Sequence, residues 1–187
     1  MPLDTIKFIT RFVLNSKSIG AVCPSSRKLS RKMAKSINKN STTGVIIELG
    51  AGTGAVTKEI LNLGFDPKLL YSFELDTKLY TVLKNKFPHT NILNENAVNI
   101  DSFLTERNLI PCSVVSSLPL LSLPKDVVTE ILSKIENLLP TGGRFIQFTY
   151  NLNRKPSDLG FRKMRHINCS HVLINIPPAR VDVFEKV

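Results

Sequence analysis

Apolar runs and helically spaced apolar positions alternate along most of this 187-residue chain. Five short apolar runs are typical of buried strands, at residues 45–49, 69–74, 90–94, 112–118 and 144–150. Helical spacing lies between them, at about residues 55–63, 77–87, 98–108 and 125–139. A chain that alternates strand and helix in this order forms a mostly parallel sheet with helices on both faces. The pattern therefore predicts a Rossmann-like, doubly wound α/β domain.

The end of the chain follows a different pattern. After Tyr150 comes a polar stretch rich in Lys and Arg, and two closing strands are expected at residues 171–176 and 180–186. Because only Pro177 and Pro178 link them, they are expected to form an antiparallel hairpin at the sheet edge. The predicted sheet thus has seven strands, mostly parallel with a C-terminal antiparallel hairpin. This ending is typical of class I methyltransferases and not of dinucleotide-binding folds.

The first 40 residues are predicted to form basic amphipathic helices. As a helix, residues 3–14 place their apolar side chains on a broad arc and their polar ones on a narrow stripe. A helix of this kind lies in a lipid interface or packs on its own domain, and the pattern fits both. Ser25 or Ser26 is expected to cap a second helix with a basic outer face. We expect residues 1–40 to belong to the same domain as residues 41–187, with a lid at the membrane surface as one role open to them.

Most of the positive charge lies in this front part. The formal net charge of the chain is +10, and residues 1–40 contribute +8 of it, with nine Lys and Arg residues against Asp4 alone. The rest of the chain is nearly neutral. A basic front part indicates an anionic partner, either nucleic acid or the cytoplasmic face of a membrane, and a merely solvated surface is the plainer alternative.

Composition argues against several other classes of protein. Apolar residues make up 42% of the chain, which is ordinary for a globular protein. No apolar run approaches the length of a membrane span, and no signal peptide is apparent. The three cysteines and three histidines show no metal-like spacing, so we expect reduced thiols in a cytoplasmic protein and no metal site.

The first predicted strand ends in a glycine-rich segment. Glu48 closes the apolar run, Gly50, Gly52 and Gly54 follow at alternate positions, and Glu74 closes the next apolar run. Glycine is needed where a ligand meets the backbone closely and where a strand turns sharply into a helix. A carboxylate at the end of the next strand can accept both hydroxyls of a ribose. The segment therefore predicts a nucleoside site at the mouth of the sheet.

Two kinds of nucleoside cofactor fit these glycines. Gly50, Gly52 and Ala55 satisfy the dinucleotide pattern G-x-G-x-x-G/A. Glu48, however, would repel a pyrophosphate and attract a cationic amino-acid moiety. The spacing G-x-G-x-G is also that of enzymes that use S-adenosylmethionine (SAM), and the chain is short for a dehydrogenase with a separate substrate domain. These observations favour SAM over a dinucleotide.

Five segments, taken in order, resemble the bacterial phospholipid N-methyltransferases over nearly the whole chain. They are residues 19–27 (IGAVCPSSR), 48–54 (ELGAGTG), 114–124 (VVSSLPLLSLP), 147–150 (QFTY) and 175–181 (NIPPARV). The resemblance implies a class I SAM enzyme that methylates the amine of phosphatidylethanolamine. Ala51 stands where the family often has proline, and Asn96 where many members have an aspartate beside the adenine.

A looser resemblance extends to the rRNA adenine dimethyltransferases. Those enzymes hold the target base with an Asn or Asp, an apolar-Pro pair and an aromatic ring after the fourth strand. Here residues 116–120 read Ser-Ser-Leu-Pro-Leu, without the amide or the ring. The chain also has no Trp and three Tyr, so stacking surfaces for nucleic acid are scarce. A lipid amine is favoured as acceptor over nucleic acid, with rRNA adenine, another small amine, or a binding module without turnover as alternatives.

Candidate site residues follow from these motifs and this resemblance. The cofactor is expected to bind at Glu48, Gly50, Gly52, Thr53, Gly54, Glu74, Leu75, Asn96, Ala97 and Ser25. For the acceptor, we expect Ser116 and the backbone carbonyls near Leu118 and Pro119 to orient the amine, and Tyr150 to accept its hydrogen bond or face the cationic product. The predicted partners are an anionic membrane surface and its phospholipid, and the predicted location is the cytoplasm, peripherally bound to the inner face of the membrane.

Overall fold

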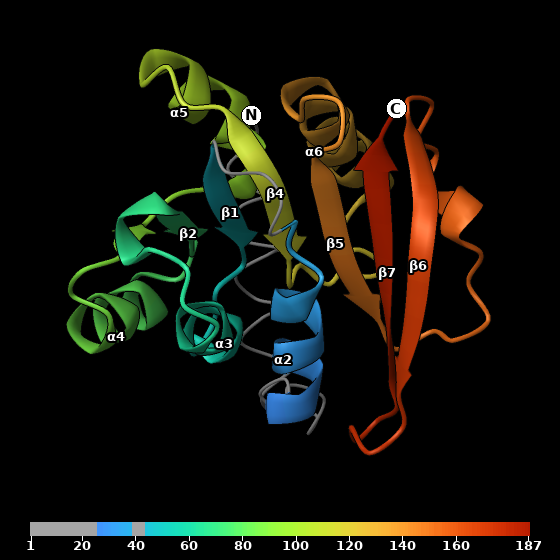
Figure 1. Cartoon of the computed structure of the whole chain (residues 1–187), viewed down its shortest axis with the longest axis horizontal. Coiled ribbons are helices and arrows are strands. Elements are labelled where there is room, and N and C mark those ends of the chain that lie inside the picture. The colour runs from blue at the N-terminus through green and yellow to red at the C-terminus, as the bar shows by residue number, and fades with distance from the viewer. Residues whose placement is uncertain (1–25, 39–43) are drawn as a thin grey trace.

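The computed structural model describes residues 26–38 and 44–187, and within them it shows a single seven-stranded sheet covered by helices (Figure 1). The strands are β1 (Val45–Leu49), β2 (Leu70–Phe73), β3 (Asn91–Leu93), β4 (Pro111–Ser116), β5 (Arg144–Thr149), β6 (Met164–Val172) and β7 (Ala179–Lys186). The helices are α2 (Arg27–Lys35), α3 (Ala55–Asn62), α4 (Thr77–Lys86), α5 (Ile100–Glu106) and α6 (Lys125–Leu138). Short 3₁₀ turns are η1 (Pro67–Leu69), η2 (Ala97–Asn99) and η3 (Pro156–Leu159).

The sheet has the predicted topology. Its strand order is β3-β2-β1-β4-β5-β7-β6. Strands β1 to β5 pair in parallel, whereas β7 pairs antiparallel with both β5 and β6. The prediction of a mostly parallel sheet with a C-terminal antiparallel hairpin is confirmed.

Two apolar cores lie on opposite faces of the sheet. One joins α5 and α6 to side chains such as Ile47, Val114 and Phe145. The other joins α2 and α3 to the alternate residues of the same strands, such as Ile46 and Val115. Because successive strand residues point to opposite faces, a strand buried on both sides reads as a continuous apolar run. This is why the central strands were predictable from sequence.

The predicted position of the sixth strand is wrong. Residues 171–176 were expected to form it, but β6 is Met164–Val172 and residues 173–178 form the turn to β7. As an edge strand, β6 exposes most of its side chains between buried Met164 and Val172, so its sequence resembles a polar loop. The apolar residues that indicated a strand lie in the turn instead.

The front of the chain is described only from Ser26. Ser26 caps α2, since its hydroxyl oxygen accepts a hydrogen bond from the Leu29 backbone N–H over 3.3 Å. The helix predicted at residues 3–14, and Ser25, lie outside the described residues. Across residues 26–38 and 44–187, no helix combines the length and the apolar content that crossing a membrane requires.

Candidate active site

The loop between β1 and α3 is held by three glycines in left-handed conformations. Gly50, Gly52 and Gly54 have φ of +72°, +58° and +77°. A side chain at Gly54 would meet the ring of Phe87 at 2.4 Å, and one at Gly50 would meet Leu118 Cδ2 at 3.0 Å. A side chain at Gly52 would meet only the Gly50 carbonyl oxygen, at 4.0 Å, so the Gly52 backbone is the part of the loop that a ligand can approach closely.

Glu74 lies directly against this loop. Its buried carboxylate accepts hydrogen bonds from the backbone N–H of Gly52 over 2.7 Å and of Asp76 over 2.9 Å. Burial raises the pKa of Glu74 above its ordinary value, although both backbone hydrogen bonds favour the ionised form. Each carboxylate oxygen retains a lone pair. The position is the one that the ribose hypothesis requires, at the end of β2 and beside the open glycine.

Glu48 is fully buried under the loop. Its carboxylate accepts hydrogen bonds from the Thr57 backbone N–H at 3.0 Å, the Thr57 hydroxyl at 2.7 Å and the Ser72 hydroxyl at 2.6 Å. Burial raises the pKa of Glu48 to about 7, against the opposing effect of these hydrogen bonds. The side chain therefore ties β1 to β2 and to the first turn of α3, and it faces these partners rather than an open surface.

The remaining predicted cofactor residues surround the same edge of the sheet. Asn96 Oδ1 accepts from the Val98 backbone N–H over 3.1 Å and starts η2, with Ala97 buried beside it. The carbonyl oxygen of Leu75 accepts from Asn94 Nδ2 over 3.1 Å. Thr53 is exposed, and its carbonyl oxygen accepts from Lys86 Nζ over 3.0 Å. The structure thus gathers the predicted residues that it describes at the carboxyl ends of β1, β2 and β3.

A cavity of about 120 Å³ lies beside the loop that follows β4, at the carboxyl ends of β4 and β5. Its apolar wall includes Leu118, Pro119, Leu120, Phe148, Tyr150 and Leu159. Its polar lining includes Gln147, Arg154, Lys155, Arg180 and Asp182. Since a side chain at Gly50 would meet Leu118, the cavity and the glycine loop are neighbours. Apolar walls with a few fixed polar groups are typical of small-molecule sites.

Three of the four predicted acceptor residues line this cavity. They are Leu118, Pro119 and Tyr150, whose ring packs edge to face on Phe148 at 5.1 Å. Ser116 does not line it: this side chain is buried, and its hydroxyl accepts from the Leu118 backbone N–H over 3.3 Å. Ser116 thus supports the loop from below.

Gln147 is a site residue that the sequence analysis did not single out. It is 5% exposed, and its Nε2 donates to the carbonyl oxygens of Leu118 at 3.0 Å and Phe148 at 2.8 Å. Two carbonyl partners fix the orientation of the amide, because only the NH₂ group can donate to them. Its Oε1 is buried and has no hydrogen-bond partner among the described residues. A buried acceptor left in this state is costly unless a bound molecule satisfies it.

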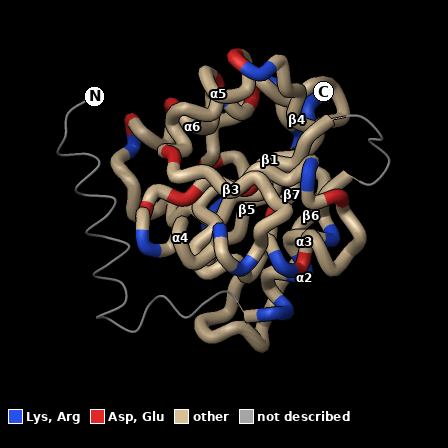
Figure 2. Tube along the Cα trace, turned by 90° about the vertical axis from the view of Figure 1, so that its left-hand side faces the viewer, with Lys and Arg blue, Asp and Glu red and all other residues tan. Residues whose placement is uncertain are grey.

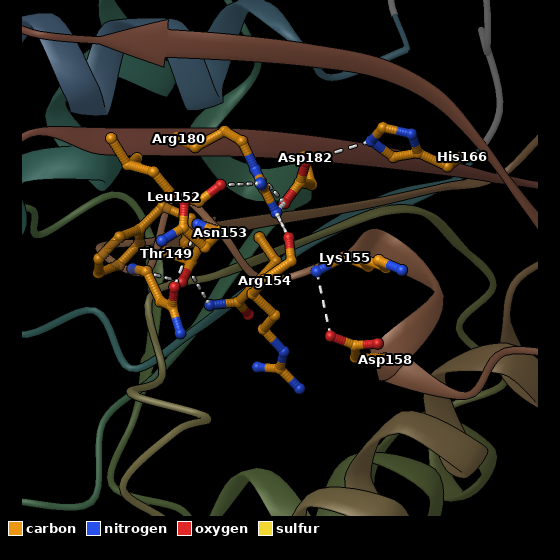
Figure 3. A network of polar contacts seen from close by, with 12 residues as sticks. Thr149, Leu152, Asn153, Arg154, Lys155, Asp158, His166, Arg180 and Asp182 are labelled. Carbon is orange, nitrogen blue, oxygen red and sulfur yellow. Dashed lines mark hydrogen bonds and ion pairs between the residues drawn. The ribbon is translucent and has the colours of Figure 1, made fainter.

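An ion-pair network contributes Arg180 and Asp182 to the lining of the cavity, and Figure 3 shows this network. The Arg180 guanidinium donates to Asp182 at 2.8 Å and to the carbonyl oxygens of Leu152 at 2.8 Å and Arg154 at 2.7 Å. Asp182 also contacts His166 Nε2 at 3.2 Å. Because Arg180 and Asp182 are buried on β7, they hold the loop after β5 in a fixed position. The Arg154 side chain points away from this network in Figure 3 and lines the cavity.

Comparison with known proteins gives relatives of two kinds. No protein-family model matches the chain. It is 27% identical over 150 residues to the ornithine lipid N-methyltransferase of Singulisphaera acidiphila, covering 78% of each chain. It is 44% identical over 62 residues to the ribosomal RNA small subunit methyltransferase A of a Sulfurihydrogenibium species, covering 33% of this chain and 23% of that protein.

Solved structures share the fold at low identity. The Burkholderia thailandensis 1,6-didemethyltoxoflavin-N1-methyltransferase, solved with S-adenosylhomocysteine (SAH) bound, matches with a TM-score of 0.74 and 14% identity. The match covers 100% of this chain and 91% of that one. The fold is therefore the class I methyltransferase fold. Together with the methyltransferase sequence relatives, it confirms the predictions of a SAM-dependent methyltransferase and of SAM as its cofactor.

Proposed function

We propose that this methyltransferase transfers methyl groups to the amine of a membrane aminolipid. Phosphatidylethanolamine, its methylated derivatives and ornithine lipid are the candidate acceptors. The observation that carries the proposal is Gln147, which lines a largely apolar cavity together with Arg154 and Lys155 and has a buried Oε1 with no hydrogen-bond partner among the described residues. An amine that carries an anionic group a few bonds away matches both features.

The cofactor side of the proposed site is made by the glycine loop. When bound, SAM supplies a methyl group already activated by its sulfonium. Gly52 would allow the cofactor to approach the backbone, and Glu74 would accept the ribose hydroxyls. Asn96 and Ala97, at the end of β3, would border the adenine. Glu48 would act from below, by holding β1, β2 and α3 together.

On the acceptor side, the enzyme must hold a neutral amine in line with the methyl group and keep water away. An aminolipid amine is cationic at neutral pH, and desolvation by Leu118, Leu120 and Phe148 would lower its pKa. Gln147 Oε1 would accept an N–H of the amine and so direct its lone pair. Tyr150 would face the methylated, cationic product.

Arg154 and Lys155 would hold the anionic part of the acceptor. In phosphatidylethanolamine this part is the phosphate, and in ornithine lipid it is the carboxylate. A guanidinium binds either anion through paired N–H donors. The ornithine lipid N-methyltransferase relative supports an aminolipid acceptor.

The second candidate is methylation of an rRNA adenine, which the ribosomal RNA methyltransferase relative favours. Against it, Leu120 stands where a stacking ring would be needed, and it is buried in the apolar core. Phe148 and Tyr150 pack edge to face on each other. The cavity therefore offers little aromatic surface on which a flipped base could stack, whereas its apolar wall suits a small amine.

Methyl transfer from radiolabelled SAM tests the proposal. The protein is offered vesicles that contain phosphatidylethanolamine, vesicles that contain ornithine lipid, and unmethylated small-subunit rRNA, and the products are separated. We expect label in one or both lipid fractions. Label in RNA alone would establish the second candidate, and label in none of the three would exclude both.

A further inference from the structure

The turn between β6 and β7 presents a cluster of large apolar side chains to solvent. Leu173, Ile174 and Ile176 are 69%, 70% and 83% exposed, and Pro177 and Pro178 follow them. Scattered exposed apolar residues are normal on a protein surface, but three within four positions are not. A cluster of this kind marks a surface that another apolar phase covers.

This turn lies at the same edge of the sheet as the candidate active site. Thr149, at the end of β5, pairs with Arg180 near the start of β7, and Val172 pairs with Ala179. Because β7 runs antiparallel to β5, the turn extends beyond the carboxyl end of β5. Figure 1 shows the turn projecting at the lower end of the molecule, where the arrowheads of β4 and β5 also point.

The turn is fixed to the start of α2. Buried Asn175 accepts a hydrogen bond from the Ser26 backbone N–H at Oδ1 over 3.1 Å, and its Nδ2 donates to the Pro177 carbonyl oxygen over 2.7 Å. The amide therefore braces the turn from inside while the apolar residues on either side of it point outward. An ordered apolar tip loses little conformational entropy when it enters another phase.

The adjoining face of α2 is basic. Arg27, Lys28, Arg31, Lys32 and Lys35 are exposed, while Leu29 and Met33 are buried against the sheet. Arg27 pairs with Glu59 at 3.2 Å, and the other four have no ion-pair partner within the described part of the chain. Figure 2 shows Lys and Arg positions in blue around the α2 label. Apolar and cationic groups thus adjoin at one end of the molecule.

We propose that the β6–β7 turn and the basic face of α2 form a membrane-docking surface. The turn inserts Leu173, Ile174 and Ile176 below the lipid headgroups, and Lys28 and Arg31 contact anionic headgroups beside it. The charge complementarity favours an anionic bilayer over an uncharged apolar partner. The inference deepens the proposed function, because docking at this edge brings the cavity to the layer that holds an aminolipid headgroup.

Binding of the full chain to phosphatidylglycerol vesicles tests this surface without any turnover. The test variant is Leu173→Ser/Ile174→Ser/Ile176→Ser. The matched control is Leu69→Ser/Val82→Ser/Ile110→Ser, which removes three exposed apolar side chains outside this surface. We expect the test variant to lose about tenfold or more in vesicle partitioning and the control to bind as the unmodified chain does.

A second pair of variants measures how much the basic face of α2 contributes to vesicle binding. Lys28→Glu/Arg31→Glu should weaken binding roughly fivefold or more at low salt and much less at high salt, whereas Lys68→Glu/Lys84→Glu should have a small effect. Vesicle binding that the tip variant leaves intact would overturn the proposal, as would no binding by the unmodified chain. If the tip variant instead converts a dimer to a monomer in light scattering while vesicle binding persists, the surface is a subunit interface. If the chain binds vesicles but transfers no methyl group to lipid, the docking surface stands and only the proposed lipid acceptor is refuted.

Discussion

The carboxylate of Glu74 accepts a hydrogen bond from the backbone N–H of Gly52 over 2.7 Å. This contact joins the end of β2 to the part of the glycine loop that has no side chain above it. Two of the residues expected from sequence to meet the cofactor, 22 positions apart, thus meet each other directly. The loop is positioned by Glu74 before any ligand arrives, which reduces the entropy lost on binding.

Glu74→Ala should weaken SAH binding roughly ten- to a hundred-fold, because hydrogen bonds to a charged group contribute about 1.5–3 kcal/mol. Isothermal titration calorimetry measures the affinity. Glu106→Ala removes an exposed glutamate on α5 and serves as the control. Unchanged SAH affinity in a folded Glu74→Ala protein would remove Glu74 from the cofactor site.

Gly54→Ala should destabilise the protein by about 2–4 kcal/mol, because a left-handed φ and a crowded side-chain position act together. Its φ is +77°, and a Cβ there would lie 2.4 Å from the Phe87 ring and 2.7 Å from Leu83. Gly64 has a φ of +85° with nothing within 4 Å, so Gly64→Ala should cost only about 1 kcal/mol. Urea unfolding of the two variants measures the difference, and equal losses would show that the contact with Phe87 relaxes freely.

More of the fold than of the acceptor site could be predicted from the sequence. Strands β1 and β4 are buried on both faces, so their apolar runs were unambiguous, and the glycines fixed the turn into α3. The edge strand β6 carried no such signal, because most of its side chains are exposed and need not be apolar. Its apolar turn residues, which read as strand, are exposed at the tip.

The acceptor-binding part of the site depends on side-chain contacts that the spacing of residues in the sequence does not reveal. A glutamine in a strand such as β5 carries no signal of its own in the sequence. Gln147 stands out in the structure because its NH₂ group donates to the carbonyl oxygens of Leu118 and Phe148, while its oxygen has no hydrogen-bond partner in the part of the chain that the structure describes. Ser116 looked well placed at the end of β4, but the chain turns so that its hydroxyl meets the Leu118 N–H. Sequence gives the residue at the strand end and not the direction of its side chain.

Glu48 should make the protein less stable as the pH rises. Burial raises the pKa of Glu48 from an ordinary 4.5 to about 7, so the folded state binds its proton more tightly than the unfolded state does. The resulting stability is fully present below about pH 4.5, falls between about pH 4.5 and 7, and is lost above that, a change of roughly 3 kcal/mol. The raised pKa of Glu74 acts with the same sign.

Glu48→Gln should flatten this pH dependence without abolishing it, because the contribution of Glu74 remains. Urea unfolding free energies at several pH values between 5 and 8 provide the test. The unmodified chain should lose stability across this range faster than Glu48→Gln does. Parallel curves would mean that Glu48 is ionised in the folded protein throughout.

Arg154→Gln should raise the KM for an anionic aminolipid by roughly fivefold or more and leave SAH affinity unchanged. The reason is the loss of a charge-assisted contact to the phosphate or carboxylate of the acceptor. The Arg154 carbonyl oxygen still accepts from Arg180, so the loop stays in place. Arg162→Gln, which removes an arginine that does not line the cavity, is the control. An equal effect of both variants would indicate general attraction to the vesicle.

Gln147→Met should reduce methyl transfer to a primary amine roughly tenfold, since it removes a hydrogen-bond acceptor of about 1–1.5 kcal/mol while keeping the side chain's length. It also removes the hydrogen bonds that Nε2 donates to the carbonyl oxygens of Leu118 and Phe148. Its affinity for SAH should not change, because the glycine loop and Glu74 are untouched. Asn62→Met, on the exposed part of α3, is the control for loss of an amide.

The effect of Gln147→Met on ligand binding should depend on how many N–H groups the ligand's nitrogen carries. A trimethylated headgroup has none, so phosphocholine should bind SAH-loaded Gln147→Met as it binds the unmodified chain. Phosphoethanolamine, with N–H groups to donate, should bind the variant several-fold more weakly, as an NMR titration would measure. Equal weakening of both ligands would mean that Gln147 only supports the loop through Leu118. A selective loss would place the Gln147 oxygen against the reacting amine.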